Sequence, residues 1–295
     1  MSDLNVPYCL IFGHGAPLDH PALAGLALRD VTRMAHEPPS PSAVAPMLEP
    51  FLDPFVRNFL FGLERGAFDG AALIVVWRAG PGALHAFRYA SELRRLGLLP
   101  DGPPLFLWSR ADSTGGAAQA FDAEQTGRLT RALTGLQRGA VADRAGPLAA
   151  LHTLQRDGAI TGAEAFARHL AARETGTAHD LAPGTAARPG PRLALAGAPL
   201  GGDGLHRWLD AQGALVLDLQ GPDAPQDPLL PDLLKTHRID TLVWQVDPQD
   251  DLHGWRKPQI ARDCAAAGVA FVDLGFVPSW PTPSDLPLSL PEPAA

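Results

Sequence analysis

One stretch decides the fold class of this chain: RLALAGAPLGGDGLHRWLDAQGALVLDL, residues 192–219. Its first apolar run, Leu193–Ala196, ends in a glycine-rich turn. A segment with the composition of a helix, Leu205–Gln212, comes next, and a second apolar run, Ala214–Leu219, follows it. This order predicts a strand, a turn, a helix and a second strand parallel to the first.

The same order of strand, helix and strand occurs in two other places. The segments are Ala71–Trp77, Gly82–Leu96 and Pro104–Trp108, and then Thr241–Val246, a helix that reaches Ala266, and Val269–Leu274. Short continuous apolar runs that alternate with helices are typical of parallel sheets covered on both faces. We therefore expect an α/β protein with two similar Rossmann-like lobes, each built on a parallel sheet, and a helical connection between them.

We expect four parts along the chain. They are a first α/β lobe over residues 1–128, a helical connector and linker over 129–190, a second α/β lobe over 191–280 and a proline-rich tail over 281–295. Within the first lobe, Tyr8–Phe12 predicts a strand and Leu23–Ala35 a helix. Met47–Arg65 predicts an amphipathic helix, because phenylalanines recur there at four-residue spacing.

Composition narrows the classes of partner. The chain is 46% hydrophobic and 19% charged, as a globular protein is. Its net charge is −8 and its basic residues are dispersed, so we expect no nucleic-acid partner. No apolar run approaches the roughly 18 residues of a membrane helix, and no basic segment marks a signal peptide. We expect a cytoplasmic protein with no membrane partner.

The two cysteines, Cys9 and Cys264, lie far apart in the sequence. They exclude a disulfide framework, and they exclude any site that needs three or four thiolates from this chain alone.

The turn GHGAPLDH, residues 13–20, follows the first predicted strand. In parallel sheets, ligands lie at the carboxyl ends of the strands. His14 and Asp19 are therefore our candidate catalytic residues for proton transfer. Loop packing and capping are the bland explanation of the same residues, and a metal site could begin here. Because the other histidines show no partner spacing, we predict no metal ligands.

The turn GAPLGGDG, residues 197–204, follows another predicted strand. Main-chain N–H groups of Gly197, Gly201 and Gly202 could bind a phosphate of a cofactor or substrate at the start of the next helix. A tight structural turn, with Asp203 as the helix cap, is the alternative.

Several segments resemble the component subunits of 2-hydroxyacyl-CoA dehydratases and benzoyl-CoA reductases. They are APLD with the later AG (residues 16–25), FLDPFVRNFLFGLERG (51–66), AALIVVW (71–77), GAITG (158–162), and the stretches at 192–219 and 239–276. The similarity spans most of residues 8–276. It implies two Rossmann-like lobes, dimerisation with a related subunit, and acyl-CoA beside a [4Fe–4S] cluster held by cysteines. An ATP-driven activator protein supplies the electron in this family.

The positions that match the family's cluster cysteines are Asp53, Ala79 and Asp247 or Asp250, and none is a cysteine. Iron–sulfur clusters need thiolate ligands. The resemblance thus implies a cluster-less pseudo-enzyme that binds acyl-CoA and forms a heterodimer with a cluster-bearing subunit, or a homodimer. Asp19 stands where the family has a glutamate. The cofactor stays open, because the family's cluster is expected but its ligands are absent.

Two other functions stay open at this point. The first is a stand-alone hydrolase or lyase that uses Asp19, His14 and a divalent metal in a cleft between the lobes, where Asp247 and Asp250 supply carboxylates. The second is a binding module without chemistry. The sequence does not indicate whether the chain is an enzyme, nor which acyl group it would accept.

Overall fold

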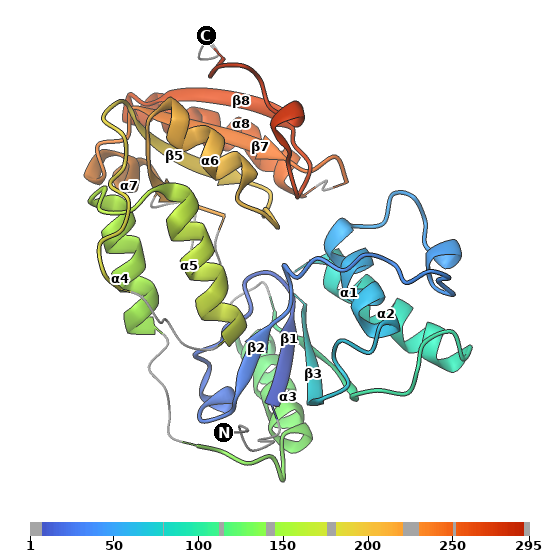
Figure 1. Ribbon diagram of the computed structural model, residues 1–295. Coiled ribbons are helices and arrows are strands. Elements are labelled where there is room, and N and C mark those ends of the chain that lie inside the picture. The colour runs from blue at the N-terminus through green and yellow to red at the C-terminus, as the bar shows by residue number, and fades with distance from the viewer. Residues whose placement is uncertain are drawn as a thin grey trace. The chain divides into compact units, whose positions relative to one another are not determined.

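The computed structural model describes residues 8–78, 80–111, 115–139, 145–175, 181–220, 230–249 and 252–291. The chain divides into two compact units, residues 1–144 with 173–177 and residues 145–172 with 178–295. Each unit contains a four-stranded parallel sheet with helices packed against it (Figure 1). The predicted fold class is confirmed: the protein is α/β, with two Rossmann-like lobes.

The first unit has the strand order β2-β1-β3-β4. Its strands are β1 (Tyr8–Phe12), β2 (Leu28–Asp30), β3 (Ala71–Arg78) and β4 (Leu105–Ser109). Its helices are α1 (Pro54–Glu64), α2 (Pro81–Arg95) and α3 (Gly116–Ala132). Alternate residues of β1 point to opposite faces. Ile11 joins Leu129 of α3 in one core, whereas Phe12 contacts Phe59 of α1, with ring centroids 4.4 Å apart.

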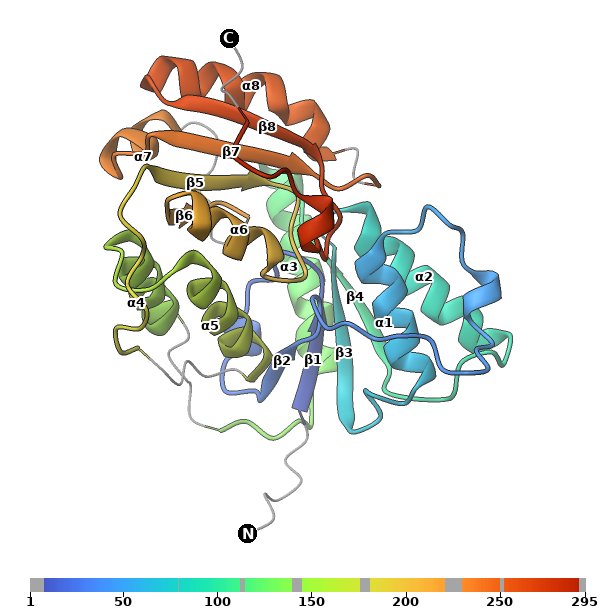
Figure 2. The same cartoon turned by 45° about the horizontal axis from the view of Figure 1, so that its top comes forward.

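The second unit has the strand order β6-β5-β7-β8. Its strands are β5 (Arg192–Gly197), β6 (Ala214–Asp218), β7 (Thr241–Val246) and β8 (Ala270–Phe276). Helix α6 (Gly204–Gln212) covers one face, while α7 (Leu230–Thr236) and α8 (Leu252–Ala267) cover the other. In Figure 2, α6 and α8 lie on opposite sides of the sheet.

The segment expected as a connector contains two long helices, α4 (Ala145–Arg156) and α5 (Gly162–Thr175). Helix α4 belongs to the second unit and packs on β6. Helix α5 contributes to both units, because its last three residues, from Arg173, group with the first.

One predicted element is wrong. We expected a helix over Leu23–Ala35, but the structure has a short 3-10 helix, Pro21–Leu23, and then strand β2. Strand β2 pairs with β1, which buries Leu28 and Asp30 while Arg29 stays exposed. Pairing with a long-range neighbour therefore overrode the local helical pattern.

The two sheets have the same arrangement at their carboxyl edges: an aspartate ends the edge strand and accepts a hydrogen bond from the following turn. Asp30 ends β2 opposite Ile11 of β1, and Asp218 ends β6 opposite Leu195 of β5. Each aspartate accepts a hydrogen bond of 2.9 Å from the main-chain N–H two residues further on. The two sheets thus have equivalent turns after equivalent strands.

The tail that begins at residue 281 packs on the second unit as far as the structure describes it. Leu286 and Leu290 are partly buried against the core that includes α6. The indole of Trp208 donates to the Pro287 carbonyl at 2.8 Å.

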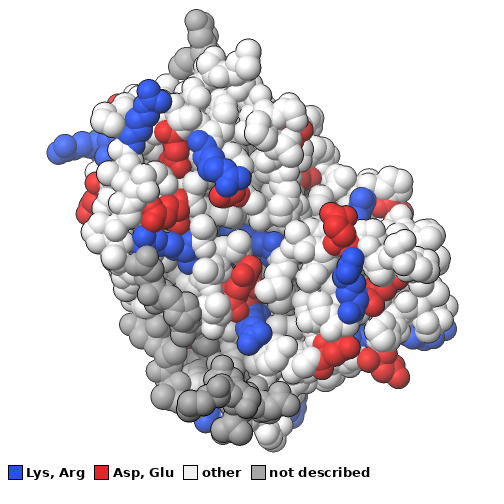
Figure 3. Space-filling view, viewed as in Figure 1, with Lys and Arg blue, Asp and Glu red and all other residues white. Residues whose placement is uncertain are grey.

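The described helices are all too short or too polar to cross a membrane. On the face drawn in Figure 3, acidic and basic side chains are interspersed, and neither sign forms a continuous patch.

Candidate functional site

Protein atoms occupy the space next to the glycine-rich turn after β5. A Cβ atom on Gly197 would lie 1.8 Å from the Gln245 carbonyl oxygen, and one on Gly201 would lie 2.2 Å from the Trp280 ring. A Cβ on Gly202 would lie 3.3 Å from the same ring. The Gly201 N–H donates to the Ser279 carbonyl at 2.7 Å. Close packing thus explains why glycine occupies these positions. The sequence had suggested either a tight turn or a phosphate-binding turn here.

Asp247 follows β7 and is buried. One carboxylate oxygen accepts from the Ser279 hydroxyl at 2.6 Å, and the other accepts from the Gln249 N–H at 2.9 Å. The side chain therefore ties the turn after β7 to the segment after β8. Asp250, the alternative candidate, lies outside the described residues.

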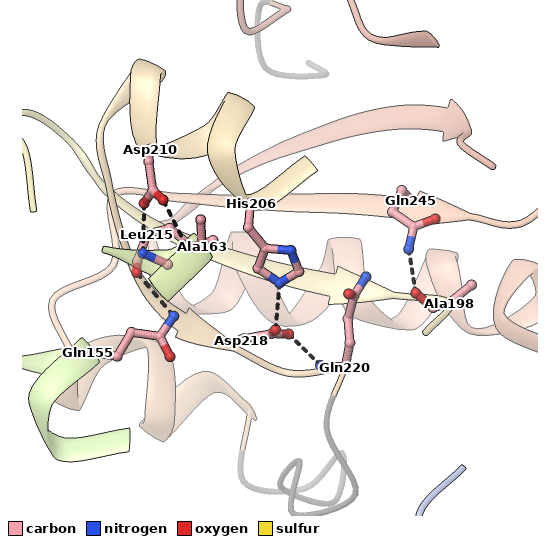
Figure 4. A network of polar contacts seen from close by, with 10 residues as sticks. Gln155, Ala163, Ala198, His206, Asp210, Leu215, Asp218, Gln220 and Gln245 are labelled. Carbon is pink, nitrogen blue, oxygen red and sulfur yellow. Dashed lines mark hydrogen bonds and ion pairs between the residues drawn. The ribbon is translucent and has the colours of Figure 1, made fainter. Parts of the chain in front are cut away.

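Several separate polar contacts link the elements of the second unit (Figure 4). The His206 Nε2 atom of α6 lies 2.9 Å from a carboxylate oxygen of Asp218, at the end of β6. The Gln245 side chain donates to the Ala198 carbonyl and links the ends of β7 and β5. His206 and Gln245 are fully buried, so these contacts fix the carboxyl edge of this sheet.

Figure 4 also shows how α5 begins. The Asp210 carboxylate accepts from the N–H groups of Gly162 and Ala163, at 2.8 Å each. These N–H groups have no partner within the helix, so the carboxylate caps it. Burial raises the pKa of Asp210, although the two N–H groups act in the opposite direction.

The turn after β1 in the first unit is held by a buried ion pair. The Arg173 guanidinium donates to Asp30 at 2.7 Å and to the Ala16 carbonyl at 3.2 Å. The Thr32 hydroxyl accepts from the Gly13 N–H at 2.8 Å and donates to Asp30. Burial acts to raise the pKa of Asp30, but Arg173 and Thr32 outweigh it, and the pKa is lowered.

The candidate catalytic residues of this turn lie in different surroundings. The His14 ring packs edge-on against Phe55 of α1, with centroids 4.4 Å apart, and is half-buried. Asp19 is exposed. Its negative charge acts to raise the pKa of the neighbouring His20, but burial and the Arg110 charge lower that pKa overall.

Asp53 is the first position where the resemblance seen in the sequence implies a cysteine, and it caps α1. Its carboxylate accepts from the N–H groups of Phe55 and Val56, at 2.7 and 3.3 Å. It also lies against the start of α2, because a Cβ on Gly82 would be 2.8 Å from its other oxygen. The second position, Ala79, lies outside the described residues.

Three aromatic rings meet at the carboxyl edge of β3 and β4. Trp77 and Trp108 are paired in register, and their ring centroids are 4.8 Å apart. The His20 ring packs edge-on against Trp108 at 5.0 Å. We did not predict this cluster from the sequence, although the equivalent positions of the two tryptophans in their predicted strands were a signal for it.

Neither described cysteine is available as a ligand or nucleophile. Burial raises the pKa of the Cys9 thiol to about 11 and that of the Cys264 thiol to about 12. A thiol with such a pKa is almost wholly protonated at neutral pH, and the thiolate is the reactive species. In the described part of the chain, no three His, Cys, Asp or Glu side chains are grouped closely enough to hold a metal ion.

We expect neither thiol of the native protein to react with Ellman's reagent at pH 8, and both to react in guanidinium chloride. The reaction can be followed by absorbance, and the denatured sample serves as the control for total thiol. Rapid reaction of one thiol in the native protein would contradict the burial of Cys9 and Cys264.

Comparisons with known proteins add no family assignment. No protein-family model matches the chain, and no curated protein matches it.

Proposed function

We propose that this chain is an acyl-CoA-binding subunit related to those of 2-hydroxyacyl-CoA dehydratases and benzoyl-CoA reductases, that it has no iron–sulfur cluster of its own, and that it pairs with a cluster-bearing subunit. One observation carries the proposal. At both described positions where the resemblance implies a thiolate ligand, Asp53 and Asp247, the chain has a carboxylate that is hydrogen-bonded within the protein.

The donor set does not fit a [4Fe–4S] cluster. Such clusters are bound by thiolates, whereas both of these side chains offer oxygen. Asp53 caps α1, and both oxygens of Asp247 accept hydrogen bonds, from Ser279 and Gln249. The loops that would hold cluster ligands are stabilised instead by hydrogen bonds. We therefore assign no electron-transfer step to this chain.

The two-lobe fold supports the proposed binding of acyl-CoA. Parallel sheets bind ligands at the carboxyl ends of their strands. In the second unit that edge is closed by the Trp280 ring and by the contact between Asp247 and Ser279. In the first unit it carries the rings of Trp77, Trp108 and His20, with the Arg110 charge close by. Aromatic rings beside a positive charge suit an acyl group with a polar carbonyl.

Anaerobic purification of the tagged chain from its native host tests this proposal. We expect a related subunit with cluster cysteines to co-purify and to be identified by mass spectrometry. Iron and acid-labile sulfide should be found in the complex and not in the separately expressed chain. The chain should also bind acyl-CoA in titration calorimetry.

A stoichiometric iron–sulfur cluster in the chain alone would contradict the proposal, as would the absence of acyl-CoA binding by both the chain and the complex. A divalent metal that is lost in the Asp247→Ala variant would favour the stand-alone hydrolase or lyase instead.

A further inference from the structure

Two tryptophans of the first unit have buried indole N–H groups that lie in one cluster. Trp77 of β3 is 7% exposed and Trp108 of β4 is fully buried. They face each other across adjacent strands, since the register pairs them directly and their rings are in edge contact.

Neither indole nitrogen has a hydrogen-bond partner among the described residues. The indole nitrogen can only donate, so its partner must be an acceptor. A buried tryptophan N–H usually has such a partner, and a donor without one needs an explanation. Two adjacent donors in the same cluster indicate that an acceptor belongs there.

Both indoles belong to the edge of the sheet at which parallel α/β folds bind ligands. Trp77 is the last residue but one of β3, and Trp108 is the last but one of β4, so both lie at the carboxyl edge. Arg110 follows Trp108 closely, and its charge acts on the His20 ring that packs on Trp108.

Two acidic groups also lie at this edge. Asp122 is 3.6 Å from the Arg110 guanidinium, with half of the Arg110 side chain exposed, and Asp19 is near His20. The positive charge of Arg110 is thus partly neutralised by these carboxylates. A neutral group with a polar oxygen therefore suits the edge better than a phosphate, and the aromatic rings suit an apolar substituent on that group.

We propose that the acyl group of an acyl-CoA binds at the carboxyl edge of β3 and β4, where its thioester carbonyl oxygen accepts hydrogen bonds from the indole N–H groups of Trp77 and Trp108. This inference rests on the proposed function, because it takes acyl-CoA as the ligand, and it names the residues that contact the acyl part. The His20 ring packs edge-on against Trp108, so the ligand displaces this ring on binding.

The test compares butyryl-CoA and benzoyl-CoA with CoA itself by titration calorimetry. Trp77→Phe and Trp108→Phe remove the N–H donor and keep an aromatic ring. We expect each to weaken acyl-CoA binding roughly three- to tenfold and to leave CoA binding unchanged. Trp255→Phe, at an 85% exposed position in the second unit, is the matched control and should bind as the wild type does.

Indole N–H signals in ¹H–¹⁵N spectra of the wild type provide an independent measurement that needs no variant to fold. The signals of Trp77 and Trp108 should move downfield when butyryl-CoA is added and stay in place when CoA is added.

Three outcomes separate the two proposals. If the wild type binds acyl-CoA but both indole variants match the Trp255→Phe control, only the acyl site is overturned. Unchanged indole signals on saturation with butyryl-CoA would also overturn the acyl site alone, and would point to a buried water as the acceptor. If the wild type binds no acyl-CoA, the proposed function itself fails.

Discussion

The Arg173→Met variant is expected to be less stable than the wild type by about 3–5 kcal/mol. Its guanidinium is the charged partner of Asp30, and the two side chains are only 12% and 8% exposed. Methionine keeps much of the aliphatic volume but leaves the Asp30 carboxylate buried without its counter-charge. The Ala16 carbonyl also loses its donor, so the turn after β1 should loosen.

Urea unfolding followed by circular dichroism measures this effect. Arg95→Met is the control, because Arg95 forms an exposed ion pair with Glu92 on the surface of α2, and surface pairs contribute little. The double variant Asp30→Asn with Arg173→Met should recover part of the loss, since it removes the uncompensated charge. Equal stabilities of Arg173→Met and Arg95→Met would show that the buried pair does not stabilise the fold.

The ion pair between Asp30 and Arg173 should also make the stability of the protein depend on pH. The pKa of Asp30 in the folded protein lies below its ordinary value of 3.8. Its contribution to the free energy of unfolding is therefore present above pH 3.8 and is lost as the pH falls toward the folded-state pKa. The stability difference between the wild type and Arg173→Met should shrink in that acidic range.

The Gly197→Ala variant is expected to be destabilised by roughly 2–6 kcal/mol. Gly197 has φ of +119°, which alanine rarely adopts, and its added Cβ would lie 1.8 Å from the Gln245 carbonyl oxygen. That oxygen belongs to the main chain of β7, so it cannot move aside without breaking the pairing of β5 with β7. A Cβ on the equivalent Gly13 would lie 2.2 Å from the Trp77 carbonyl oxygen, so Gly13→Ala should be destabilised in the same way.

The matched control is Gly254→Ala in α8, where an added Cβ meets no atom within 4 Å. That change should be neutral or stabilising by up to about 1 kcal/mol, because alanine is the better helix former. Thermal unfolding of the three variants gives the comparison. If Gly197→Ala were as stable as Gly254→Ala, the close approach of β5 to β7 at this glycine would be refuted.

The strands at Tyr8–Phe12 and Thr241–Val246 have the bounds predicted from their apolar runs. Short apolar runs between polar turns encode buried strands locally, and their alternation with helices encodes a parallel sheet. The helix predicted over Met47–Arg65 begins only at Pro54, because Asp53 caps it and proline suits its first turn. Local chemistry was therefore enough for the fold class and for most elements.

Strand β2 could not be predicted in this way. A segment of three residues is too short to show a hydrophobic periodicity. Leu28–Asp30 is a strand because it pairs with β1. The same limit applies to the candidate site. His14 and Asp19 were chosen because they follow a predicted strand. The surroundings of His14 depend on Phe55, and those of the neighbouring His20 depend on Arg110, and both partners are distant in the sequence.

Two parallel α/β lobes can be read from the order of amino acids alone, and so can the presence of aspartate at positions 53 and 247. What those residues do depends on folding: Asp53 caps a helix, and Asp247 binds Ser279. Folding also brings Trp77 and Trp108 into contact and packs Trp280 over the glycine-rich turn. The reason is physical, because a local pattern encodes periodicity and burial, while the partner of a side chain depends on segments that meet only in the folded chain.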